Sequence, residues 1–227
     1  QMHVWDQDSF GRIQFSSEEM GTSELGHIIE NQSLVNALHH QVSQQPNVQM
    51  LPSTHIAKVL TGQSETMLML DSDEVVSCRL LVGADGANSA IRKYANFPLT
   101  FKDYGHTAIV ATIKTAAPHG KVARQVFTPT GPLALLPLSD PNLCSIVWSQ
   151  NSQQADELLA LSNSDFAKAL QVAIEGDVGE IAVESARMHF PLTMRYARQW
   201  LSDGLVIIGD AAHTIHPLAG QGANLGL

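Results

Sequence analysis

The residue types most able to bind a ligand gather in the segment from Gly209 to Asn224. Residues 205–208 before it are all apolar and predict a buried strand, so Asp210 comes at the carboxyl end of that strand. Open α/β sheets bind their ligands at this end of the strands. A carboxylate placed there can accept hydrogen bonds from ribose-type hydroxyl groups. The pattern therefore predicts a ligand site with Asp210 as its main polar residue.

A proline and two glycines follow in the same segment. Pro217 fixes the backbone, while Gly220 and Gly222 allow the chain to approach a flat ligand closely. A helix predicted to begin near Ala223 would turn its N–H groups and positive dipole end toward that ligand and favour negative charge on it. The alternative is that the glycines only make a tight turn from strand to helix.

A second Asp-Gly pair follows another apolar run. Residues 80–84 predict a buried parallel strand, and Asp85 and Gly86 come directly after it. Ser89 can then cap a short helix that contains Arg92. An Asp-Gly pair after a strand is usually only a turn. The signal becomes specific because the first segment follows at a separation of about 125 residues.

Together the two segments resemble the group A flavoprotein monooxygenases, the family of p-hydroxybenzoate hydroxylase. The resemblance implies FAD as the cofactor and NAD(P)H as the reductant. It implies that Asp85, Gly86 and Arg92 support binding of FAD and of the pyridine nucleotide, and that Gly209 and Asp210 contact the ribityl or ribose hydroxyls of FAD. The residues that it places along the isoalloxazine ring are Pro217, Gly220, Gln221, Gly222, Ala223 and Asn224.

Three further stretches, residues 4–6, 25–31 and 123–127, are similar to the polyprenylphenol hydroxylases of ubiquinone biosynthesis. This likeness implies that the substrate is a polyprenylated phenol and that the protein works in a ubiquinone-biosynthesis complex or in peripheral contact with a membrane, because a prenyl tail partitions into lipid. The Gly-x-Gly-x-x-Gly fingerprint of the family has no match here. We therefore expect the N-terminal unit that carries it, and a C-terminal portion, to lie outside these residues.

Two other readings of the same sequence stay open. One is a non-catalytic fragment that serves as a protein-interaction module, which the missing fingerprint favours. The other is a different flavin-dependent enzyme of the superfamily, a reductase or a halogenase. No catalytic acid or base can be chosen from the sequence.

The order of the strand and helix patterns that position these residues predicts a mixed α/β fold in two parts. Residues 23–96 and 194–227 are expected to form a partial Rossmann-like FAD-binding layer. An antiparallel-sheet substrate domain, residues 1–22 and 97–193, is inserted into it, because closely spaced apolar runs with short turns are typical of such a sheet.

Local patterns predict several elements within these parts. Residues 2–15 predict a β-hairpin, and residues 31–44 predict a helix with one buried apolar face. Two helices are expected over residues 153–161 and 165–174, and a strand over residues 181–190. The candidate N-caps of the two helices are Ser152 and Ser164.

Composition narrows the function classes. The net charge is -9, with no run rich in Lys or Arg, so nucleic acid is not an expected partner. Cys78 and Cys144 lie in apolar, strand-like stretches and are expected to be free thiols of a cytoplasmic protein.

No run of the sequence approaches the roughly 18 apolar residues that cross a bilayer. His213 and His216 have the spacing of two metal ligands, but no Cys or carboxylate set completes a site, so no metal is expected.

Overall fold

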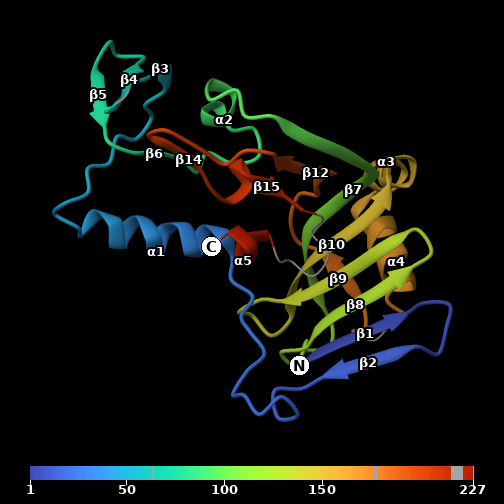
Figure 1. Cartoon of the computed structure of the whole chain (residues 1–227). Helices are drawn as coiled ribbons and strands as arrows, with labels where there is room; N and C mark the ends of the chain where they lie inside the picture. Colours follow the sequence, from blue (N-terminus) through green and yellow to red (C-terminus); the bar gives the residue numbers. More distant parts are fainter. Residues whose placement is uncertain (63, 176–177, 216–221, 227) are drawn as a thin grey trace. The chain divides into compact units, whose positions relative to one another are not determined.

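The structure is a computed structural model that describes residues 1–62, 64–175, 178–215 and 222–226 (Figure 1). The chain divides into two compact units. The first comprises residues 1–42 and 105–191, and the second comprises residues 43–104 and 192–227. Strands β7 (Leu99–Thr115) and β12 (Met188–Ala197) each run from one unit into the other. The sequence placed the corresponding divisions after residues 22, 96 and 193.

A mainly antiparallel sheet forms the centre of the first unit. The pairing runs from β7 through β10, β9, β8 and β1 to β2, and only β1 and β8 are parallel. Short turns at residues 129–130 and 138–142 join β8, β9 and β10, which explains the antiparallel order that the sequence predicts. The strands, in addition to β7, are β1 (Met2–Asp6), β2 (Arg12–Phe15), β8 (Ala123–Thr128), β9 (Gly131–Pro137), β10 (Leu143–Asn151) and β11 (Ile181–Val183), which pairs with β7.

Helices α3 (Ser152–Ala160) and α4 (Asn163–Ala173) cover one face of this sheet (Figure 1). Alternate residues of β10, among them Ile146 and Trp148, are buried with Phe166 and Leu170 of α4 in one hydrophobic core. The N-caps lie one or two residues before the predicted ones. Asn151 accepts a hydrogen bond from the backbone N–H of Gln154, and Ser162 accepts one from that of Asp165.

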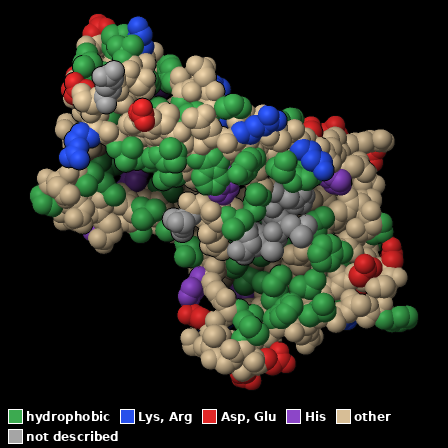
Figure 2. Space-filling view, in the orientation of Figure 1, with side chains coloured by type: hydrophobic (Ala, Val, Ile, Leu, Met, Phe, Trp, Pro, Cys, Tyr) green, Lys and Arg blue, Asp and Glu red, His purple; other side chains and the backbone are tan. Residues whose placement is uncertain are grey.

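The opposite face of the same sheet, here called the outer face, carries the other alternate residues. One row crosses five strands in register and comprises Val110, Val147, Ala134, Gln125 and Val4. The row is apolar except for one amide. Four of its residues are partly exposed and Gln125 is buried. Figure 2 shows hydrophobic side chains gathered over β8 and β9.

Two predictions for the first unit are wrong. Helix α1 (Asn31–Ser43) forms as expected, but it buries none of its residues, and Leu34 and Leu38 are 45% and 54% exposed. The described residues supply no packing partner for its apolar face. The single strand expected over residues 181–190 is broken between β11 and β12, where the guanidinium of Arg187 turns to donate to the carbonyls of Leu158 and Leu161 at the end of α3.

The second unit contains two small sheets. An antiparallel sheet is formed by β3 (Ile56–Thr61), β4 (Thr66–Leu70) and β5 (Val75–Cys78). In the other, β6 (Leu81–Gly83) pairs in parallel with β14 (Leu205–Ile207), which pairs with β13 (Leu201–Ser202). The remaining elements are α2 (Ala90–Tyr94), the 3-10 turn η1 (Gly209–Ala211), β15 (His213–Thr214) and α5 (Gly222–Gly226). The helix at Arg92 and the parallel pairing of the strand before Asp85 are therefore confirmed. The expected burial of this strand is wrong, because Leu80 and Val82 are 56% and 46% exposed.

The described residues also allow statements on membrane crossing, disulfides and metal binding. Among the described residues, no helix combines the length and the apolar character that a membrane crossing needs. Both cysteines are free thiols, and Cys144 is buried. The described part of the chain brings no three metal-binding side chains together.

Candidate functional site

The two Asp-containing segments meet at one edge of the parallel β6–β14 pair. Gly83 pairs with Ile207, and the backbone N–H of Ile208 donates to the carbonyl of Gly83 at 2.9 Å. Asp85 follows two residues after Gly83, and Asp210 follows three residues after Ile207. Because parallel strands end at the same edge, both carboxylates arrive there from positions far apart in the sequence.

Gly83 lets these elements pack closely. A Cβ atom at this position would lie 2.8 Å from Cγ2 of Ile91 and 3.0 Å from Cγ2 of Ile207. Helix α2 and β14 therefore approach the backbone of β6 more closely than any side chain would permit. The glycine that begins the Asp85 segment is needed for packing rather than for a turn.

The carboxylate of Asp85 organises the loop that enters α2. One oxygen accepts from the hydroxyl of Ser89 at 2.5 Å, and the other accepts from the backbone N–H groups of Ala90 and Ile91 at 2.7 and 3.2 Å. Burial alone would raise the pKa of Asp85, but these hydrogen bonds and one from its own N–H outweigh burial, so its pKa lies below the ordinary value. Gly86 follows with a φ of +79°, which explains the glycine of the pair.

Arg92 connects the two Asp-containing segments through hydrogen bonds of its side chain. Its guanidinium donates to the carbonyl of Ala211 at 2.7 Å and to the carbonyl of Ala87 at 2.8 Å, and the residue is 5% exposed. Burial and the neighbouring charge of Arg195 lower its pKa, while Asp85 opposes this shift. These hydrogen bonds fix the position of η1 relative to the loop after β6.

Arg195 is the residue that sequence reasoning did not assign to this edge. Its guanidinium donates to the carbonyl of Ala87 at 3.0 Å and to the side-chain oxygen of Asn88 at 2.6 Å. It lies on β12, where it pairs with Thr214 of β15. An isolated Arg in a strand gives no local signal of this role, because only the fold brings it beside Ala87.

Asp210 differs from Asp85 in having its carboxylate available. It is exposed in η1, and none of the described residues donates a hydrogen bond to its side chain. Gly209 before it has a φ of +57°, and a Cβ atom there would meet no atom of the described residues within 4 Å. The described residues therefore leave space on the Cβ side of Gly209 and around the carboxylate of Asp210, where hydroxyl groups could donate to the carboxylate.

The remaining predicted site residues lie at the end of the described chain. Helix α5 begins at Gly222, close to the predicted start, and includes Ala223 and Asn224. The Cβ position of Gly226 in α5 lies 3.1 Å from the Cα of Gly209, so the helix lies beside the turn that holds Asp210. Pro217, Gly220 and Gln221 lie outside the described residues, as does His216. His213 stacks against Trp200 with ring centroids 5.4 Å apart.

Comparison with known proteins gives a consistent result. A sequence profile described as an FAD binding domain matches residues 22–227. The chain is 34% identical over 263 residues to the ubiquinone biosynthesis monooxygenase COQ6, mitochondrial, of Drosophila melanogaster, covering 100% of this chain and 55% of that protein. It is 32% identical over 225 residues to the 3-demethoxyubiquinol 3-hydroxylase of Escherichia coli, covering 99% of this chain and 57% of that protein. The chain thus spans just over half the length of these relatives.

A solved structure shares the fold. Pseudomonas aeruginosa PqsL in complex with 2-aminobenzoylacetate superposes with a TM-score of 0.81 at 22% sequence identity, covering 99% of this chain and 63% of that chain. At this level of identity the likeness concerns the fold alone.

Proposed function

Because this chain belongs to the FAD binding domain family, we propose that it is part of a flavin-dependent monooxygenase that hydroxylates a polyprenylated phenol in ubiquinone biosynthesis, with NAD(P)H as the reductant. Both curated relatives bear the names of enzymes that oxygenate intermediates of this pathway. The observation that carries the proposal is the meeting of the Asp85 and Asp210 segments at one edge of the β6–β14 pair.

The groups at this edge have the chemistry that FAD requires. The cofactor presents ribityl and ribose hydroxyls, and the exposed carboxylate of Asp210 would accept hydrogen bonds from one of them. The open backbone at Gly209 would let the cofactor approach closely. When bound, FAD would carry electrons from NAD(P)H to oxygen, while the protein supplies orientation and excludes water.

The other predicted site residues would act at two places. Gly222, Ala223 and Asn224 would turn the N–H groups of α5 toward the flavin ring and favour negative charge there. Asp85, Gly86 and Arg92 would hold the loop against which FAD and the pyridine nucleotide lie, since their hydrogen bonds shape that loop.

We assign substrate binding to the inserted sheet, residues 1–22 and 97–193, and cofactor binding to residues 23–96 and 194–227. The outer face supports this assignment, because Val110, Val147 and Ala134 form a row without charge on which a phenol ring and an apolar tail could lie. The single amide in the row, that of Gln125, could hydrogen-bond a ring substituent.

The chemistry of the substrate suggests where the protein works. A prenyl tail partitions into lipid, so the enzyme would reach its substrate at the cytoplasmic surface of a membrane or within a complex of biosynthetic proteins. The two free thiols agree with a reducing compartment.

The experiment that tests this function uses the purified full-length protein that contains this sequence. Supplied with FAD, NAD(P)H and a short-chain polyprenylphenol, it should form a product heavier by one oxygen atom, measured by mass spectrometry with labelled oxygen. Val147→Asp should raise KM at least about tenfold by placing a charge on the outer face, whereas Val147→Ile should not. NAD(P)H oxidation without oxygen transfer to any phenol would overturn the proposal.

A further inference from the structure

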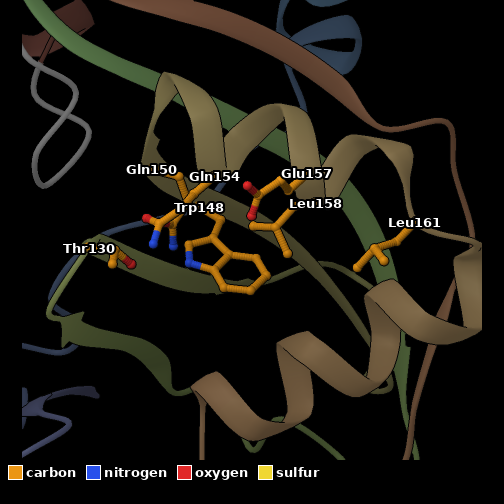
Figure 3. A pocket seen from close by; sticks show the side chains of 7 residues that line it. All are labelled: Thr130, Trp148, Gln150, Gln154, Glu157, Leu158 and Leu161. Atoms are coloured by element: carbon orange, nitrogen blue, oxygen red, sulfur yellow. The ribbon is translucent and has the colours of Figure 1, made fainter.

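A pocket lies in the first unit, on the face of the sheet opposite to the outer face. It has a volume of about 350 Å³ and lies between β10 and α3 (Figure 3). Trp148 and Gln150 of β10 form its floor, and α3 forms one wall. The complete lining is Thr130, Trp148, Gln150, Gln154, Glu157, Leu158 and Leu161.

Two buried polar atoms in this lining have no hydrogen-bond partner within the described structure. They are the indole Nε1 of Trp148 and the amide Oε1 of Gln150, on residues that are 5% and 3% exposed. The first is a donor and the second an acceptor. Figure 3 shows the indole nitrogen on the same side of the pocket as the amide ends of Gln150 and Gln154, toward Thr130. Buried polar groups are nearly always satisfied, so a bound molecule is expected to complete this pair.

The rest of the lining combines the polar side chains of Thr130, Gln154 and Glu157 with apolar walls. The indole ring, Leu158 and Leu161 supply apolar walls, and Trp148 packs edge-on against Phe166 at 5.8 Å between ring centroids. Arg187 anchors the end of α3 through the carbonyls of Leu158 and Leu161. The volume is about ten times that of one water molecule in the liquid, and a cavity of about 150 Å³ already admits benzene.

We propose that this pocket binds a small, uncharged phenol. A single hydroxyl group can accept from the indole N–H of Trp148 and donate to the amide oxygen of Gln150, and one aromatic ring fits the apolar walls. The carboxylate of Glu157, which is part of the lining, disfavours anionic ligands. The pocket is too small for a long prenyl tail and lies on the helix-covered face, so it is separate from the proposed substrate surface.

The experiment is a fluorine-NMR titration of the full-length protein with 4-fluorophenol. Fluorobenzene, which lacks the hydroxyl, and 4-fluoroanisole, which cannot donate, should each bind roughly three to ten times more weakly, and 4-fluorobenzoate should not bind. Trp148→Phe and Gln150→Met each remove one hydrogen bond and should weaken 4-fluorophenol binding by a similar factor. Leu161→Trp should fill the pocket and abolish binding.

Trp5→Phe is the matched control. Trp5 is also a buried indole in this sheet, and its Nε1 has no partner among the described residues, but it does not line the pocket. Its substitution should leave 4-fluorophenol affinity unchanged. Gln150→Met and Leu161→Trp change the pocket at residues other than Trp148. If one variant fails to fold, the other two therefore still test whether 4-fluorophenol binds in this pocket. Absence of saturable binding, or equal affinity in all pocket variants, would overturn the proposal.

Discussion

The guanidinium of Arg92 donates a 2.7 Å hydrogen bond to the carbonyl of Ala211, a residue 119 positions further along the chain. This contact holds together the two loops that carry Asp85 and Asp210. Arg92→Met leaves the carbonyl of Ala211 without this donor and should lower the free energy of unfolding by about 2 kcal/mol, measured by urea denaturation. Lys93→Met, an exposed change on the same helix, should stay within about 0.5 kcal/mol of the parent. Equal effects of the two substitutions would contradict this role.

The close packing at Gly83 predicts a steric effect. Gly83→Ala should destabilise the protein by about 1–3 kcal/mol, because the new methyl group overlaps Ile91 and Ile207. Ile91→Ala removes the Cγ2 atom that the new methyl group overlaps, so it should cost less stability in Gly83→Ala than in the parent. A double-mutant cycle measured by urea denaturation tests this coupling, and strictly additive effects would argue against it.

The hydrogen bonds of Asp85 predict a pH dependence of stability. Its folded-state pKa lies below the ordinary value of 3.8, so the ionised carboxylate stabilises the fold above that pH and loses this contribution as pH falls through the folded-state pKa. The parent should therefore be more stable than Asp85→Asn at pH 7, and the gap should narrow below about pH 4. Ser89→Ala, which removes one donor, should shrink the gap measured at pH 7. A gap that is constant from pH 7 to pH 3 would contradict the assignment.

The elements around the candidate site could be predicted because their signals are local. The apolar runs before Asp85 and Asp210 predicted two strands, which form and pair in parallel but are only partly buried, and Ser89 marked the start of α2 as its cap. The hairpin and the antiparallel insert followed from apolar runs separated by turn residues. The predicted caps, Ser152 and Ser164, lie one and two residues after the observed caps, Asn151 and Ser162, because several neighbouring residues are of types that can cap a helix.

The rest could not be predicted because it depends on contacts between distant residues. Nothing local to Arg195 indicates that it donates to Ala87, and nothing local to Arg92 indicates that it reaches Ala211. The pocket beside Trp148 depends on how α3 lies over β10. The apolar spacing of α1 indicated a buried face, but spacing reports only that a face is apolar, not that the described residues cover it.

The most direct test of the account is the affinity of the full-length protein for FAD after Asp210 is changed. Asp210→Asn should keep the fold and weaken FAD binding roughly 10- to 100-fold, because a charge-assisted hydrogen bond to a cofactor hydroxyl is lost. Asp203→Asn, a change of another exposed carboxylate in the same unit, should leave the affinity unchanged. The measurement is a fluorescence titration of FAD. Equal Kd values for the parent and Asp210→Asn would contradict the assignment of this edge as the flavin site.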